Sequence, residues 1–442
     1  MIHKFFHKGL YIVLDVNSGT LLSVDKCAYD IIDHVVLPLP EVLRIFSDKH
    51  DKTVITEAYG ELKRLIADDL LFSADNTDSF YESSATPVLK ALCILLAADC
   101  NLRCGYCFAD TGSFFGKRAL MPRLTAEKAI DFLIAHSGSR QSLEVDFFGG
   151  EPLLNYEVLK ETVYYATDKA EKHGKKINFT LTTNGTLIDD EKIEYINANM
   201  QNVVLSIDGR KEVHDFLRKT ISGKGSYATI IPKIQKLIEK RGDKDYYIRG
   251  TFTARNLDFS KDAAHLADLG FRHISIEPIV SAADMKFSLK NEHLPIIFSE
   301  YEQLLERVRT DAFSFFHFNI DLAGGPCVYK RLSGCGAGTE YLAVTPSGDL
   351  YPCHQIAGNT DYRLGDIITG VCNSPMIENK TELFKYPLKK SACAACWAKF
   401  YCGGGCAAAA LNIEGDINKP YELGCQMQKK RTEMALIKAI DM

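Results

Sequence analysis

The chain has 442 residues, of which 46% are hydrophobic and 25% are charged, and its formal net charge is −5. This balance is typical of a folded protein with two or three domains. No basic block suits nucleic acid and no apolar run could cross a bilayer, so neither is an expected partner. The first residues lack the apolar core and cleavage site of a signal peptide, which favours a cytoplasmic location.

Residues 1–75 predict a small module of their own. Strands are expected at 11–16, 20–24 and 70–72, and helices at 26–36, 40–47 and 57–67. Asn17-Ser18-Gly19 suits a hairpin turn between the first two strands, and Thr56 is the expected N-cap of the last helix. Two or three strands with three short helices indicate a winged-helix-like module. The polar stretch 76–87 is expected to be a linker.

Residues 88–285 predict alternating strands and helices. The strands are expected at 91–96, 143–148, 177–182, 203–207, 246–252 and 273–277, with helices at 125–136, 156–172, 189–199, 227–241 and 259–269. This alternation predicts an α/β fold, a partial (β/α)6 barrel around a parallel sheet. Ligands of such folds sit at the carboxyl ends of the strands.

Residues 286–442 predict a different kind of structure. A helix at 294–309 is followed by a region rich in cysteine, glycine and turn residues, where regular structure is expected to be sparse. Metal ligation would organise such a region in place of a hydrophobic core.

The chain has 14 cysteines, and most of them are closely spaced. Without a secretion signal, disulfides explain such a pattern poorly, and clustered cysteines more often bind metal. Cys27, Cys93 and Cys372 stand outside any pattern. They are expected to be buried apolar residues.

Cys100, Cys104 and Cys107 follow the first barrel strand with the spacing C-x3-C-x2-C. Three thiolates can hold a cubane iron–sulfur cluster and leave its fourth iron open for a substrate or cofactor. The alternatives are an incomplete zinc site and three packed thiols. A structural zinc site wants four protein ligands, and no fourth lies nearby, which favours the cluster.

With Tyr106 before the third cysteine, this motif resembles that of the radical S-adenosylmethionine (SAM) superfamily. The resemblance implies a [4Fe–4S] cluster whose open iron binds SAM, which one electron then cleaves to a 5′-deoxyadenosyl radical. The strand ends carry further matches to SAM-binding positions: Gly149, Gly150 and Glu151 of a GGEP motif for the amino group, Asn184 and Ser206 for the ribose, and Arg218 for the carboxylate. Taken singly, each is more often a turn or cap residue.

Seven later cysteines resemble the SPASM extension of peptide-modifying radical SAM enzymes, and they imply two auxiliary [4Fe–4S] clusters. Cys393, Cys396, Cys402 and Cys425 would hold an outer cluster, and Cys335, Cys353 and Cys406 an inner one. Cys327 is a candidate fourth ligand of the inner cluster. The other possibility is an open iron that takes a substrate thiolate. A zinc ribbon would use four ligands, whereas nine cysteines lie between Cys327 and Cys425.

The N-terminal module resembles the domain with which maturases capture the leader of a precursor peptide by β-strand addition. Its alternative is an oligomerising or DNA-reading winged helix. The whole chain, from VLDVNSG through ADCNLRCGYCFAD to GCGAGTEYLAVTPSGDLYPCHQ, resembles the maturases of SCIFF peptides, named for six cysteines in forty-five residues.

That resemblance implies three [4Fe–4S] clusters, SAM, a Cys-rich precursor peptide and a flavodoxin- or ferredoxin-like electron donor. The implied reaction joins a cysteine sulfur to a carbon of another residue, such as threonine, in a thioether. An auxiliary cluster would bind the sulfur or accept the leftover electron. No acid or base of the protein is assigned. The alternatives are formylglycine formation of the sulfatase-maturating type and a non-catalytic iron–sulfur electron carrier.

Overall fold

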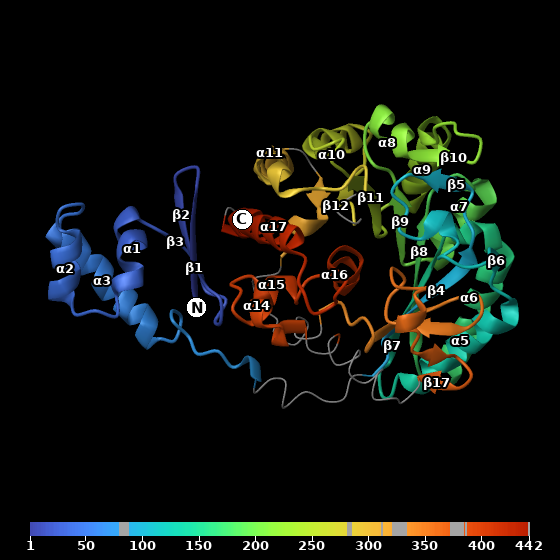
Figure 1. Cartoon of the computed structure of the whole chain (residues 1–442), viewed down its shortest axis with the longest axis horizontal. Coiled ribbons are helices and arrows are strands. Elements are labelled where there is room, and N and C mark those ends of the chain that lie inside the picture. Colours follow the sequence, from blue (N-terminus) through green and yellow to red (C-terminus); the bar gives the residue numbers. More distant parts are fainter. Residues whose placement is uncertain are drawn as a thin grey trace.

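A computed structural model describes residues 1–78, 88–280, 285–310, 313–320, 334–371, 384 and 387–440. Figure 1 shows three parts in a row: the N-terminal module on the left, the cysteine-rich part in the middle and the sheet with its helices on the right. Within these ranges, no helix combines the length and the apolar character that a membrane span requires.

A mostly parallel sheet forms the largest part. Its central strands lie side by side in chain order: β4 (Ala91–Ala98), β7 (Ser142–Gly149), β8 (Lys176–Thr183), β9 (Asn202–Ser206), β11 (Tyr246–Phe252) and β12 (His273–Pro278). The helices between them are α5 (Arg123–His136), α6 (Tyr156–Lys172), α7 (Asp190–Asn199), α9 (Tyr227–Arg241) and α10 (Phe259–Asp268). The predicted α/β fold with six parallel strands is therefore confirmed.

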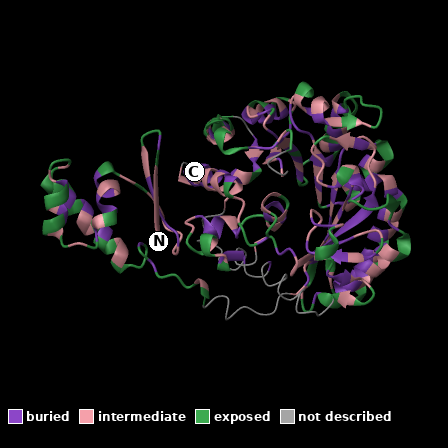
Figure 2. Cartoon of the chain, in the orientation of Figure 1, coloured by how far each residue is buried: buried purple, intermediate pink, exposed green. Residues whose placement is uncertain are grey.

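Strands β7, β8, β9 and β11 each bury one face and leave the other partly accessible, whereas β4 is buried along its whole length. In β7, Leu143, Val145 and Phe147 are buried in the core, whereas Asp146 and Phe148 between them are half-buried. Successive side chains of a strand point to opposite faces, so the apolar set packs against the helices. Figure 2 shows much of the ribbon of the sheet and of its helices in purple, the colour of buried residues. The half-buried set, which includes both Asp146 and Phe148, lines the inner face.

The cysteine-rich part continues the same sheet, which the sequence did not predict. Strand β14 (Tyr341–Val344) pairs in parallel with β4, and β15 (Asp349–Tyr351), β16 (Gly365–Asp366) and β17 (Gly370–Val371) follow antiparallel. At the other edge, β13 (Ser314–Phe315) pairs with β12. Among the described strands β13 and β17 do not pair with each other, so the barrel stays open.

Regular structure near the C-terminus is also richer than expected. Helix α16 (Ala407–Glu414) follows the last closely spaced cysteines, and α17 (Glu422–Ile440) contains Cys425. Helix α17 packs against α11 (Leu294–Thr310), the helix predicted after the barrel. The cysteine-rich part is thereby joined to the barrel on both sides, through β14 and through α11.

The N-terminal module has a three-stranded antiparallel sheet, β1 (Ile2–His7), β2 (Leu10–Asp15) and β3 (Leu21–Val24), in the order β1-β2-β3. Helices α1 (Lys26–Ile31), α2 (Leu39–Phe46) and α3 (Lys52–Ala67) share a core with Val13 of β2. Leu14, on the opposite face of β2, packs with Phe400 and Leu436 of the cysteine-rich part. The sheet thus lies between its own helices and the rest of the chain.

Two expectations for this module were wrong. Helix α3 begins at Lys52, because the Asp51 carboxylate caps it by accepting from the Thr53 N–H, and Thr56 lies inside the helix. Residues 70–72 form a turn, with Phe72 at a φ of 56°, and the third strand is β1 instead. Most of the predicted linker, 79–87, lies outside the described residues.

Candidate active site

The three cysteines of the C-x3-C-x2-C motif lie in a loop held by a short two-stranded ribbon. Strand β5 (Leu102–Cys104) pairs antiparallel with β10 (Arg218–Thr220), which puts Arg218 opposite Cys104. The Cys104 thiol lies within electrostatic range of Cys100 and Cys107. The structure therefore brings the predicted trio together at the carboxyl end of β4.

These thiols lie in a setting that opposes the free thiolate. Burial raises the pKa of Cys100 to about 11 and that of Cys104 to about 12. A thiolate is favoured in such a place when a bound metal centre supplies positive charge. In the described part of the chain, no three His, Cys, Asp or Glu side chains converge on a single ion.

The two glycines of the GGEP motif are required by contact between backbones. A Cβ on Gly149 would lie 2.4 Å from the Ala97 carbonyl oxygen, and one on Gly150 would lie 2.1 Å from that of Asp99. This close approach allows the Gly150 N–H to donate to the Ala97 carbonyl and the Glu151 N–H to donate to the Asp99 carbonyl. The end of β7 is thereby bound to the segment that leads into Cys100.

Glu151 is fully buried and links two strand ends. Its carboxylate accepts hydrogen bonds from the Thr183 hydroxyl (2.8 Å), the Asn184 N–H (2.8 Å) and the Leu153 N–H (3.1 Å). Burial raises the pKa of Glu151 to about 7, although these hydrogen bonds lower it. Most of its hydrogen-bonding capacity therefore serves the loop after β8.

Asn184 connects that loop to the cysteine motif. Its Nδ2 donates to Asn101 Oδ1 (2.9 Å) and lies 3.7 Å from the Cys100 sulfur, and its Oδ1 accepts from Thr186. The side chain expected at the ribose thus orders the cysteine loop. Ser206 ends β9 and is half-buried.

Asp208 was not among the predicted site residues, yet it lies at the centre of this strand end. It is fully buried and accepts from the Tyr106 hydroxyl (2.8 Å), from Arg218 Nε (3.1 Å) and from the Thr251 N–H. Tyr106 and Arg218, both predicted, therefore share one carboxylate. Its signals in the sequence were its place after a predicted strand and its membership of Ser206-Ile207-Asp208-Gly209, which resembles a SAM-binding strand end of the family.

A second unpredicted network lies between the barrel and the auxiliary cysteines. Glu277 of β12 accepts from His317 at 2.9 Å, and Arg431 of α17 approaches both residues. Burial raises the pKa of Glu277, but His317 and the nearby arginines outweigh it and hold that pKa well below its usual range. The charge of Glu277 reaches Cys406, so the network borders the auxiliary cysteines.

The auxiliary cysteines fall into the two predicted groups. Cys393, Cys396, Cys402 and Cys425 line one pocket. Cys353 lies within electrostatic range of Cys335 and Cys406. Burial raises the pKa of Cys353 and of Cys425 to about 12.

The remaining cysteines bear on two smaller predictions. Cys327, the candidate fourth ligand of the inner group, lies outside the described residues, as does Cys372. Cys27 and Cys93 are buried and free, which confirms the prediction for those two.

Two family models match this chain. The model of the radical SAM superfamily matches residues 94–277, and that of an iron–sulfur cluster-binding domain, SPASM, matches 335–397. The mycofactocin maturase MftC of Mycolicibacterium smegmatis is 30% identical over 322 residues, 70% of this chain and 76% of that protein. The chain therefore belongs to the radical SAM superfamily and carries a SPASM domain. Membership implies a [4Fe–4S] cluster and SAM, and hence an enzyme of radical chemistry.

Other relatives show how far the similarity extends. The serine-type anaerobic sulfatase-maturating enzyme of Bacteroides thetaiotaomicron is 27% identical over 365 residues, 72% of this chain and 83% of that protein. The structure of anSMEcpe with bound AdoMet covers 79% of this chain and 98% of its own, with a TM-score of 0.65 and 21% identity. The structure of Streptococcus suis SuiB bound to its precursor peptide SuiA covers 96% of this chain and 98% of its own, with a TM-score of 0.55 and 15% identity.

Proposed function

We propose that the protein is a maturase that forms a thioether in a Cys-rich ribosomal peptide, between a cysteine sulfur and a carbon of another residue such as threonine. The observation that carries this proposal is the docking of the N-terminal sheet beside the outer cysteine group. His3 of β1 stacks on Trp397, the neighbour of Cys396, with ring centroids 3.6 Å apart. Asp75 pairs with Lys399, which lines the same pocket as Cys396.

The SAM site is proposed at the carboxyl ends of β4, β7, β8 and β9. Cys100, Cys104 and Cys107 would hold its cluster, and this centre with SAM supplies a 5′-deoxyadenosyl radical that takes a hydrogen atom from the peptide. Arg218 uses only Nε on Asp208, and its two terminal nitrogens have no hydrogen-bond partner among the described residues. They can therefore donate to a carboxylate. Glu151 lies at the neighbouring strand end and suits the ammonium group.

Two auxiliary clusters are proposed in the SPASM domain, which makes three in all. Cys393, Cys396, Cys402 and Cys425 would hold the outer one. Cys335, Cys353 and Cys406 would hold the inner one, whose fourth ligand is either Cys327 or a thiolate of the substrate. A substrate cysteine bound there would be held as its thiolate and positioned for sulfur–carbon bond formation.

The leader of the precursor peptide is proposed to add a strand to the N-terminal sheet. β3 is one edge of this three-stranded sheet, and an edge strand can pair with an extended peptide. The likeness to SuiB supports this role, because it extends over 96% of the chain and that protein was solved with a precursor peptide.

Formylglycine formation is the second candidate, favoured by the similarity to sulfatase-maturating enzymes. The anSMEcpe structure, however, covers only 79% of this chain, against 96% for SuiB. The greater coverage favours a maturase that works on a leader-bearing peptide.

The test is anaerobic incubation with SAM, a reductant and a Cys-rich precursor peptide encoded beside the gene. The product is then reduced and alkylated before its mass is measured. A thioether predicts the loss of two hydrogen atoms and one cysteine that no longer alkylates. Conversion of a cysteine or serine to an aldehyde would support the second candidate instead. An unmodified peptide with normal 5′-deoxyadenosine would contradict the proposed substrate.

A further inference from the structure

Three cations surround a pair of aromatic rings beside the cysteine loop. Phe216 of helix α8 (Lys211–Leu217) and Phe287 pack edge to face, with centroids 5.8 Å apart. The Arg255 guanidinium lies 3.6 Å from the Phe216 centroid. Lys219 lies 5.7 Å from the Phe216 ring and Lys286 5.6 Å from the Phe287 ring. We call these five residues the cationic face.

The cationic face adjoins the point at which the cysteine loop reaches the surface. Gly105, between Cys104 and Tyr106, is exposed, and its N–H donates to the Leu217 carbonyl. A Cβ on Gly105 would lie 3.0 Å from Leu217 and 3.9 Å from the Phe287 ring. Lys219 lies on β10, directly opposite Arg103 of β5. Any cluster held by this loop is therefore close to the cationic face.

Within the described residues, the charges of this face have no ion-pair partner. Arg255, Lys219 and Lys286 are exposed, and no carboxylate of the described residues forms an ion pair with any of them. Surface lysines and arginines elsewhere in the chain commonly have such partners, for example Lys211 with Asp215. An aromatic patch ringed by unpaired cations is typical of a surface that meets an acidic partner.

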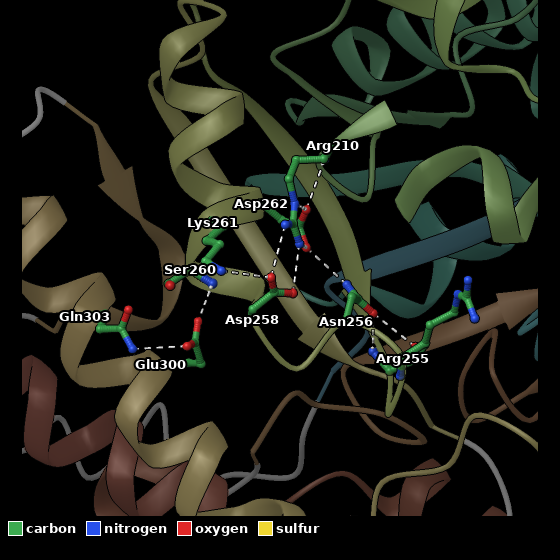
Figure 3. A network of polar contacts seen from close by, with 10 residues as sticks. Arg210, Arg255, Asn256, Asp258, Ser260, Lys261, Asp262, Glu300 and Gln303 are labelled. Atoms are coloured by element: carbon green, nitrogen blue, oxygen red, sulfur yellow. Dashed lines mark hydrogen bonds and ion pairs between the residues drawn. The ribbon is translucent and has the colours of Figure 1, made fainter. Parts of the chain in front are cut away.

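A hydrogen-bond network surrounds the backbone of Arg255, whose N–H donates to the Thr253 hydroxyl. Asn256 Oδ1 accepts from the Thr253 N–H and hydroxyl, and Asn256 Nδ2 donates to Asp262. Arg210 donates to both Asp262 and Asp258. Figure 3 shows this network, with the Arg255 side chain directed away from the two carboxylates. The backbone of Arg255 is thereby fixed, and its guanidinium is positioned by its contact with the Phe216 ring.

We infer that the cationic face binds a small acidic one-electron carrier protein, which reduces the cluster held by the cysteine loop. This inference rests on the proposed cluster. In the step, the reduced flavin or iron–sulfur centre of the carrier loses one electron and the cluster gains it, and no proton or covalent bond is transferred. Charge complementarity would speed the encounter of carrier and enzyme.

The cationic face lies far from the proposed leader site. Figure 1 shows α8, β5 and β10 at the end of the molecule opposite the N-terminal module. A carrier on the cationic face and a leader on β3 would therefore not meet. The carrier and the precursor peptide are expected to bind at the same time.

The test compares two double variants of equal charge change. Lys219→Glu with Lys286→Glu reverses two charges of the face. Lys63→Glu with Lys176→Glu is the control, because both lysines are exposed, form no ion pair with a described carboxylate and lie on α3 and at the amino end of β8. The binding of purified acidic flavodoxin to each cluster-loaded enzyme is measured by interferometry at low and high salt. SAM cleavage is then followed with reduced flavodoxin and, separately, with dithionite.

At low salt, the face variant is expected to bind flavodoxin at least about tenfold more weakly than the control variant. High salt should reduce this difference in affinity. Its flavodoxin-driven SAM cleavage should slow, while dithionite-driven cleavage stays at the wild-type rate. Equal flavodoxin binding by both double variants would overturn the inference, as would displacement of flavodoxin by the precursor peptide or by DNA. If the wild type did not cleave SAM with dithionite, the proposed function would be refuted instead. The flavodoxin-binding measurement would then still decide whether the cationic face binds the carrier.

Discussion

His3 and Trp397 lie parallel within 3°, so a ring from the first strand of the chain stacks on a ring beside a predicted cluster ligand. His3 Nε2 also lies 3.1 Å from Glu433 of α17. The N-terminal sheet is therefore held to the SPASM domain by specific contacts as well as by apolar packing.

Trp397→Ala is expected to loosen this docking. The loss of a stacked pair costs about 1 kcal/mol beyond the buried area, which corresponds to roughly fivefold faster local opening. Hydrogen exchange of the β1 amides measures this opening. Tyr164→Ala removes an aromatic ring that is 80% exposed on α6 and is the control. Unchanged β1 exchange in Trp397→Ala would show that the stack does not hold the module.

Removal of the first cysteine trio is expected to remove one cluster and leave two. An enzyme with three [4Fe–4S] clusters holds about 12 iron atoms, and the Cys100→Ala, Cys104→Ala, Cys107→Ala variant should hold about 8. Iron and sulfide assays of the reconstituted proteins measure this. Cys27→Ser, at a buried cysteine outside all three cysteine groups, should keep the full iron content. A loss of all iron in the triple variant would mean that the clusters do not assemble independently.

Arg218→Lys is expected to weaken SAM binding about tenfold. Lysine keeps the charge but loses the planar fork that can grip both Asp208 and a carboxylate. Equilibrium dialysis with the cluster-loaded protein measures the affinity. Lys219→Ala, at the exposed next position, is the control. An unchanged affinity would exclude Arg218 from the SAM site.

His214 is expected to make stability depend on pH. Its Nδ1 accepts from the Asp208 N–H, so Nε2 carries the proton and donates to Ser226. Burial lowers the pKa of His214 from 6.5 to about 4. Between these values the unfolded chain binds more protons, so this contribution, at most about 3 kcal/mol, is present above pH 6.5 and is lost as pH falls toward 4.

His214→Asn keeps an acceptor and a donor but does not titrate. The thermal midpoint of the wild type should therefore fall more steeply than that of the variant between pH 7.5 and pH 5.5. His173→Asn, at an exposed histidine, should follow the wild type. Parallel curves for wild type and His214→Asn would contradict the assigned pKa.

The barrel was predictable because strand-like runs and helical segments alternate at regular intervals along the chain. The first cysteine trio was predictable from its spacing, whereas the two later groups were assigned from the resemblance to the SPASM extension. Strands β15 to β17 have two or three residues each, too few for a periodic signal. Arg431 and His317 lie 114 positions apart, and no local pattern announces such a contact. Asp208 was missed because one acid after a strand is usually a turn residue.

The most direct test of thioether formation follows hydrogen from a uniformly deuterated precursor peptide into 5′-deoxyadenosine. The account predicts one deuterium per 5′-deoxyadenosine, in equal amount to a peptide that has lost one carbon-bound deuterium and one alkylatable cysteine. Unlabelled 5′-deoxyadenosine beside an unchanged peptide, or a labelled nucleoside beside an aldehyde product, would contradict it.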